Sequence, residues 1–199
     1  MTANPPPYRK LTAAEFMRLA VDGSFANLRG ERVELIGGEV VTVSPQGGFH
    51  SAFIDFTADA LKAAFGPGYW VRVQYTLDLA PHSVVDPDIA VVAGSRAENF
   101  ARLGNGNPTT ALLVVESSLT TIGSDRTRKA SLYAAAGIPD YWIIDVEARR
   151  LEVRRDPRPD PAAEFGASYH SLAVLTPGDT ISPLARPAAV VAVADMIPA

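Results

Sequence analysis

The sequence predicts one α/β (α+β) domain over residues 1–199, with a mixed β-sheet covered by a few helices. Apolar runs of strand length alternate along the chain with longer segments of helical periodicity, as expected for such a sheet. Two alternating runs, residues 32–36 and 39–43, flank Gly37 and Gly38 in the pattern of a β-hairpin. Apolar residues make up 47% of the chain and charged residues 20%, which is typical of a globular protein with a core of ordinary size.

Glycine, proline and capping residues divide the chain into its predicted elements. The proline-rich segment 1–7 predicts an extended, flexible leader, and Thr12 is placed to cap the short helix that follows. Residues 49–65 carry apolar side chains at helical spacing and end at Gly66. The other predicted elements are strands at 69–79, 89–93 and 111–116, a loop at 94–109, a helix at 125–137, a hairpin at 141–146 and 151–154, a loop at 156–167, and strands around 171–175 and 188–193.

The charge balance limits how the protein can bind nucleic acid. Lys and Arg number 18 against 22 Asp and Glu, a net charge of −4, so binding through bulk positive charge is not expected. Any such role must rest on local patches, for which a solvated surface is the alternative interpretation. The candidate patches are Arg126, Arg128 and Lys129, and then Arg149, Arg150, Arg154, Arg155 and Arg158.

Several other classes of protein are excluded by composition. The lack of cysteine excludes disulfides, thiolate zinc sites and cysteine nucleophiles. With no signal-peptide core and no apolar run of bilayer length, we expect a cytoplasmic protein without a membrane span. The three histidines lack metal-binding spacing, so zinc is not expected. There is no nucleophile elbow and no phosphate loop, and we expect no organic cofactor.

Lys129 is the most informative residue because it falls on an apolar helix stripe. Ser124 or Asp125 can cap the predicted helix, and Gly137 can end it. On a 3.6-residue period Lys129 shares the inward stripe with Leu132, Tyr133 and Ala136. A core-facing ammonium needs a carboxylate or a reacting group, since burying the charge alone costs several kcal/mol. The pattern indicates a polar site on an apolar scaffold.

Two carboxylates fall at the ends of neighbouring predicted strands. Asp88 follows Pro87 at the start of one strand, and Glu116 ends the next. If they lie close together, they repel each other unless a proton or a cation lies between them. Oxygen ligands without His or Cys favour Mg²⁺ or Mn²⁺. A lysine beside such an ion can orient or deprotonate water, so the pattern favours phosphodiester hydrolysis.

These residues also resemble a known group of proteins. Pro87-Asp88, then Glu116 at a strand end, then a lysine is similar to the PD-(D/E)XK nuclease superfamily, whose fold is restriction-endonuclease-like. The resemblance extends to its Uma-type restriction endonuclease family and covers about residues 8–155 in the family's order. The residues that carry it further are Glu34-Leu35-Ile36-Gly37-Gly38-Glu39, Asp125 with Lys129, Tyr133, Gly137-Ile138-Pro139 and Tyr141-Trp142.

The resemblance implies a metal-dependent DNA endonuclease with a restriction-endonuclease-like mixed sheet. It implies Mg²⁺ or Mn²⁺ ligands at Asp88 and Glu116, completed by the backbone carbonyl of Ser117. It assigns Lys129 as the catalytic lysine and Glu34 as an additional acid of the site. DNA is the expected partner. Because cutting both strands of a duplex commonly uses two active sites, a homodimer is expected.

The chain departs from the pattern at three places. Ser118 stands two residues after the glutamate, where the superfamily usually has its lysine, and relocation of the lysine to the helix, at Lys129, is consistent with the family that the chain resembles. Gly37 replaces an acid of the family, which we attribute to turn chemistry. The segment Ser117-Ser118-Leu119-Thr120 lacks the family's usual proline after the glutamate.

Each assignment has a structural alternative. Asp88 could only cap a turn, Lys129 could extend its ammonium to solvent, and Glu34 could be a solvent-facing strand residue. Asp125 is interpreted as a cap or as an i,i+4 partner of Lys129, and His50 as an ordinary helix-start residue with an unassigned role. The alternative functions are a nuclease-fold module that binds DNA or protein without cutting, and a hydrolase of small phosphodiesters.

Overall fold

The computed structural model describes residues 9–25, 32–43, 47–79 and 81–198. The predicted leader 1–7 lies outside the described residues. The chain forms two compact units: Met1–Pro45 with Asp78–Val85, and Gln46–Leu77 with Asp86–Ala199. Their organisation as one domain stays a prediction. None of the helices in the described ranges is long and apolar enough to cross a membrane.

The smaller unit combines one helix with a four-stranded sheet. Thr12 caps its helix, as predicted, in a capping box with Glu15. The predicted hairpin is confirmed, and Gly37 and Gly38 form its turn with φ of 59° and 86°, values that glycine adopts without strain. The sheet order is β2-β1-β5-β4. Its elements are α1 (Ala13–Val21), β1 (Arg32–Ile36), β2 (Glu39–Val43), β4 (Leu77–Asp78) and β5 (Val84–Val85).

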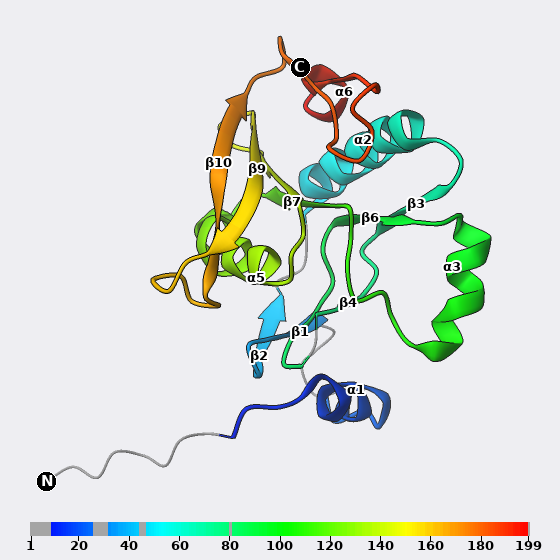
Figure 1. Cartoon of the computed structure of the whole chain (residues 1–199), viewed down its shortest axis with the longest axis vertical. Coiled ribbons are helices and arrows are strands. Elements are labelled where there is room, and N and C mark those ends of the chain that lie inside the picture. The colour runs from blue at the N-terminus through cyan, green and yellow to red at the C-terminus, as the bar shows by residue number, and fades with distance from the viewer. Residues whose placement is uncertain (1–8, 26–31, 44–46, 80, 199) are drawn as a thin grey trace, which may run out of the picture. The chain divides into compact units, whose positions relative to one another are not determined.

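The larger unit is built on a six-stranded mixed sheet with the order β10-β9-β8-β7-β6-β3 (Figure 1). Only β7 and β8 are parallel, and a helical crossover joins them. The predicted class, a mixed sheet with a few helices, is therefore confirmed. The strands are β3 (Tyr69–Val73), β6 (Ile89–Ala93), β7 (Leu113–Ser118), β8 (Asp140–Asp145), β9 (Arg150–Pro159) and β10 (Ala167–Leu175).

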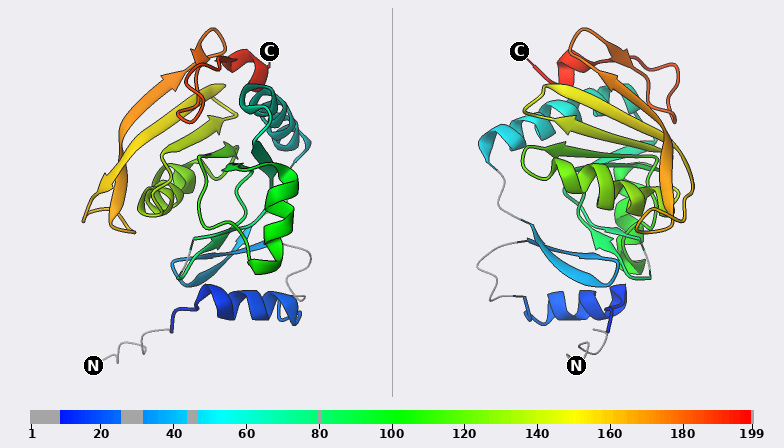
Figure 2. Two further views of the ribbon diagram at one scale, coloured as in Figure 1. Left: turned by 45° about the vertical axis from the view of Figure 1, so that its right-hand side comes forward. Right: turned by 90° about the vertical axis from the view of Figure 1, so that its left-hand side faces the viewer.

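The two faces of this sheet carry different helices (Figures 1 and 2). One face packs on α2 (Gly48–Phe65) in an apolar core that includes Leu61, Val115 and Trp142. The other face meets the crossover helix, where Tyr133 packs on Tyr141 with ring centroids 4.9 Å apart. The remaining elements are α6 (Val193–Met196), which contacts α2, and the short strands β11 (Thr180–Ile181) and β12 (Val191–Ala192).

The crossover helix differs from its prediction at its start. Helical structure begins at Ile122, not at Asp125, and runs as α4 (Ile122–Ser124), the π-helical turn η2 (Asp125–Lys129) and α5 (Ala130–Ala135). Ser124 and Asp125 therefore lie inside the helical segment and do not cap it. A π-turn inserts an extra residue into the helix, a feature that a 3.6-residue period does not reveal.

Three further predictions are corrected by the structure. Residues 94–109 are not all loop, because Ser95 and Glu98 form a capping box for α3 (Arg96–Arg102), which η1 (Leu103–Asn105) follows. The predicted strand 69–79 is broken at Gln74, whose φ is 55°.

The predicted loop 156–167 is also wrong, since β9 continues to Pro159 and β10 begins at Ala167. Pairing of β8 with β9 ends at Arg155, so the residues beyond it pair with β10 alone. Proline lacks a donor N–H and is tolerated where one side of a strand is unpaired. The strand can therefore include Pro157 and Pro159.

Substitution of Gly38 tests the packing of the hairpin turn. An added Cβ would lie 2.5 Å from Cβ of Lys10, and the left-handed backbone adds strain. We expect Gly38→Ala to lower the free energy of unfolding by about 2–3 kcal/mol. Gly23 has φ of 81° and no atom within 4 Å of such a Cβ, so Gly23→Ala should cost only about 1–2 kcal/mol. Urea denaturation would measure both, and equal losses would contradict the predicted contact.

Candidate active site

Strand register brings Asp88 and Glu116 together. Ile89 pairs with Val115 in the antiparallel β6–β7 ladder, and one step further places Asp88 opposite Glu116. The Asp88 backbone N–H donates to Oε2 of Glu116 at 3.3 Å, and the Ser117 N–H donates to Oδ2 of Asp88 at 2.9 Å. Both acids are only 4% exposed. The two carboxylates therefore form one buried group, as their positions in the sequence predict.

Lys129 and Tyr133 reach this group from the crossover helix. Nζ of Lys129 lies 3.0 Å from Oε1 of Glu116, and the Tyr133 hydroxyl donates to the same oxygen at 2.7 Å. The Lys129 side chain is 14% exposed, so its ammonium faces the acids and not bulk solvent. The sequence places Tyr133 on the inward stripe, but its bond to Glu116 is a contact that periodicity alone does not reveal.

His50 and Gln74 contact the other side of Asp88. Nε2 of His50, in the first turn of α2, lies 3.3 Å from Oδ2 and 3.4 Å from Oδ1. The Gln74 side chain donates to Oδ1 at 3.4 Å, and its backbone N–H donates to the Asp88 carbonyl at 3.0 Å. The positive φ of Gln74 that breaks the strand therefore occurs at this site. Gln74 is not among the site residues that the sequence predicts.

These neighbours decide the charge of Asp88. Burial raises the pKa of its carboxyl, but the hydrogen bond and charge of His50, the Ser117 N–H and the charge of Lys129 act in the opposite direction. The net result is a pKa below the ordinary value for aspartate. Asp88 is therefore ionised at neutral pH.

Asp125 anchors the π-turn that precedes Lys129. Its buried carboxylate accepts hydrogen bonds from the hydroxyls of Ser118, at 2.8 Å, and Thr121, at 2.6 Å. The Tyr141 hydroxyl donates to the Asp125 backbone carbonyl at 3.1 Å, and burial raises the pKa of this phenol, so it stays a neutral donor. The predicted capping role of Asp125 is wrong, since its carboxylate joins the crossover helix to the end of β7.

Glu34 belongs to the smaller unit. It lies on β1 opposite Val41 and is 3% exposed, so the solvent-facing alternative is wrong. Its role as an additional acid of the site stays a prediction.

The donor set fits a hard divalent cation. Asp88 and Glu116 supply carboxylate oxygens side by side, and Ser117 adds a backbone carbonyl at the same strand end. Lys129 and His50 lie against the same two carboxylates, so a bound cation would share their oxygens with these groups. No group of three or more His, Cys, Asp or Glu side chains that could hold a metal occurs within the described ranges. Two carboxylates with one carbonyl and water ligands would suit Mg²⁺, which usually keeps several waters.

The predicted arginine patches are largely compensated by acids. Arg126 pairs with Asp145 and Glu152, and Arg154 pairs with Glu152, which lies two residues before it on β9. Arg155, Arg158 and Arg128 have carboxylate partners at Asp140, Asp156 and Glu164. These ion pairs reduce the positive charge that the arginines can offer to a nucleic acid.

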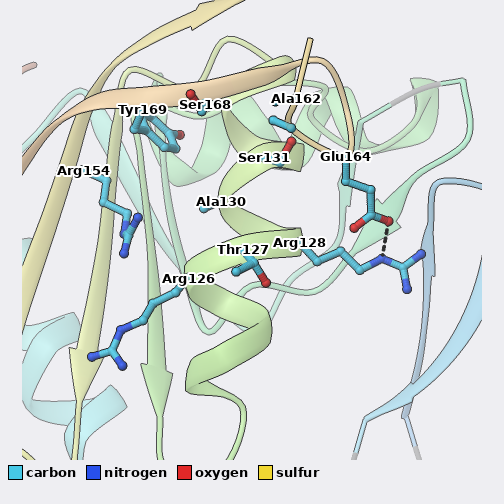
Figure 3. A pocket seen from close by; sticks show the side chains of 11 residues that line it. Arg126, Thr127, Arg128, Ala130, Ser131, Arg154, Ala162, Glu164, Ser168 and Tyr169 are labelled. Carbon is cyan, nitrogen blue, oxygen red and sulfur yellow. Dashed lines mark ion pairs between the residues drawn. The ribbon is translucent and has the colours of Figure 1, made fainter. Parts of the chain in front are cut away.

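Three of these arginines line a pocket of about 310 Å³ beside the crossover helix. Figure 3 shows Arg126 and Arg154 on one side of the helix and the Arg128–Glu164 pair on the other. Asp88, Glu116 and Lys129 are not among the lining residues. The pocket is therefore distinct from the acid pair.

Comparison with known proteins now identifies the family. A family model described as "Putative restriction endonuclease", Uma2, matches residues 13–194. The chain belongs to the Uma2 family. The fold of this Uma2 protein is similar to the crystal structure of "a putative nuclease belonging to DUF820 from Anabaena variabilis ATCC 29413". That likeness has a TM-score of 0.64 and 17% sequence identity over 94% of this chain and 97% of the other. No match is found among curated proteins.

Removal of one hydroxyl tests the bond to Glu116. We expect Tyr133→Phe to lower the free energy of unfolding by about 1.5–3 kcal/mol, because the hydroxyl bonds a charged acceptor in a buried place. Tyr169→Phe is the matched control, since its hydroxyl donates to the neutral Ile138 carbonyl at 2.8 Å. It should cost about 0.5–1.5 kcal/mol. Chemical denaturation that found the two losses equal would contradict an ionised Glu116.

We expect Glu152 to account for part of the loss of stability of this Uma2 protein at acid pH. Burial raises the pKa of Glu152, but hydrogen bonds and charges from Arg126 and Arg154 hold it below its ordinary value. The Glu152 carboxyl therefore binds a proton more readily in the unfolded chain than in the folded protein. Its contribution to stability is present above the ordinary pKa of glutamate and is lost as the pH falls through the lower pKa of the folded protein. Between pH 5 and 3, thermal unfolding should show a smaller loss of stability in Glu152→Gln than in wild type. An equal loss of stability in the variant and in wild type would contradict this contribution of Glu152.

Proposed function

We propose that the protein is a metal-dependent DNA endonuclease with a PD-(D/E)XK-type site. The observation that carries the proposal is the convergence of Asp88, Glu116 and Lys129 within one buried hydrogen-bonded group. The family's description as restriction endonucleases and the name of the structurally similar protein support a nuclease-like function. Metal dependence and the assignment of individual residues are our extension of that support.

Asp88, Glu116 and the Ser117 carbonyl would hold Mg²⁺ or Mn²⁺. When bound, the ion would polarise a phosphate oxygen and lower the pKa of a water ligand. The chain prepares Asp88 for this role by keeping it ionised, through His50 and the Ser117 N–H. Gln74 fixes the orientation of the same carboxylate.

Lys129 would act on the attacking water or on the developing charge at phosphorus. Its ammonium is already held at the acids, so a reacting group beside Glu116 would meet it without a large movement of the side chain. Tyr133 shares Oε1 of Glu116 with Lys129 and so limits the rotation of that carboxylate. Glu34 would add a fourth charged group, and its contribution can be tested separately by substitution.

DNA is the proposed substrate, and a homodimer and a cytoplasmic location remain parts of the same proposal. The net charge of −4 and the compensated arginines predict weak binding of DNA in the absence of a metal. The acidic charge balance and the altered segment after Glu116 favour a second candidate function, a nuclease-fold module that binds DNA or protein without cutting it.

Cleavage of plasmid DNA tests the proposal. Purified protein with Mg²⁺ or Mn²⁺ should nick supercoiled plasmid, and chelation should stop the reaction. Asp88→Asn and Lys129→Met should each lower the rate by about 10²-fold or more, because each removes a group that acts on the reacting atoms. Lys62→Met is the matched control, since Lys62 is exposed on α2 and pairs with Asp59, and it should keep the wild-type rate.

The controls also separate the alternatives. Folded wild-type protein that retards DNA on a gel but never nicks it would support the binding module. Nicking that survives in both site variants would contradict the assigned residues. Turnover of an aryl phosphodiester without cleavage of DNA would support a hydrolase of small phosphodiesters.

A further inference from the structure

Strand β10 ends the six-stranded sheet. It pairs along its length with β9, from Ala167 opposite Pro159 to Leu175 opposite Leu151. No strand of the larger unit's described residues pairs with its other edge. Figure 2 shows β9 and β10 as a long curved hairpin at the margin of the unit. The outer edge of a terminal strand presents backbone N–H and C=O groups that can pair with another chain.

The side chains in the middle of this strand are also exposed. All five residues from His170 to Val174 are exposed. Leu172 is 56% exposed and Val174 is 49% exposed, although both are large apolar residues. Since residues two apart in a strand share a face, His170, Leu172 and Val174 form one partly apolar row.

The opposite edge of the sheet has the protection that β10 lacks. Strand β3 is only five residues long, and its middle residues are buried. It also carries Arg72, which is 1% exposed and whose guanidinium carbon lies 4.9 and 5.3 Å from the ring centroids of Trp70 and Tyr75. Short edge strands and inward-facing charges are ways in which proteins prevent edge-to-edge pairing. The nine residues of β10 include no Lys, Arg, Asp, Glu or Pro.

We propose that β10 is the contact between two copies of this chain, which pair antiparallel about a twofold axis at Leu172. A second copy fits because a twofold axis sets a strand against itself, and any charge near the axis would then face its own copy. β10 has no such charge. Pairing centred on Leu172 sets each Leu172 beside its counterpart and each Val174 beside His170 of the partner subunit. It joins the two sheets and leaves no β10 edge free, so assembly stops at a dimer.

The oligomeric state of the full chain tests this contact without reference to nuclease activity. Sedimentation of wild type at micromolar concentration should give twice the monomer mass. Leu172→Glu should raise the dissociation constant at least about tenfold, because it sets two carboxylates opposite each other at the axis. Leu184→Glu is the matched control, since Leu184 is 45% exposed outside β10, and it should leave the dimer intact. Circular dichroism would check that each variant is folded.

Cross-linking tests the register. The chain has no cysteine, so a single introduced cysteine can pair only with its own copy. Directly opposite residues have Cα atoms about 4.5–5.5 Å apart, within the range that a disulfide spans. Oxidised Leu172→Cys should therefore run largely as a covalent dimer on a non-reducing gel, and Leu184→Cys should not. A wild-type monomer at high concentration, or a dimer in which Leu172→Cys does not cross-link, would overturn the proposal.

Discussion

The antiparallel register of β6 and β7 is the constraint on which the candidate site depends. It places two acids on facing strand positions, where each carboxylate accepts a hydrogen bond from the backbone at or next to the other acid. Buried like charges repel, so the arrangement needs compensation by nearby positive charge or donors. Lys129, Tyr133 and His50 supply that compensation from two helices that flank the sheet. The positions of these helices are therefore tied to the charge of the acids.

The crossover helix links this electrostatic requirement to the fold. Its π-turn runs from Asp125, whose carboxylate is hydrogen-bonded to Ser118, to Lys129. The turn therefore sets the direction in which the lysine side chain leaves the helix. Ser118, at the end of β7 and two residues after Glu116, donates the hydrogen bond to Asp125. Ser118 thus has a structural role, because its hydroxyl helps to hold the helical turn that carries Lys129.

Much of this fold can be predicted because its local signals are strong. The glycine pair between β1 and β2 and the apolar run of β7 each have one dominant physical explanation, and the structure decides between the two that were open for Lys129. The errors occur where tertiary contacts override local signals. Helix α3 lies in a segment rich in Gly and Asn, and β9 passes through two prolines because its far end lacks a partner on one side. Gln74 contacts Asp88 because the strand is broken at this residue, and the periodicity of the sequence does not indicate that break.

Calorimetry with Mn²⁺ tests whether the acid pair and Lys129 are arranged around a divalent cation. We expect one Mn²⁺ bound per chain, with affinity lost in both Asp88→Asn and Glu116→Gln. Lys129→Met should bind at least as tightly as wild type, because it removes a competing positive charge. Absence of binding by folded wild-type protein, or binding that survives both acid substitutions, would contradict a cation site at Asp88 and Glu116.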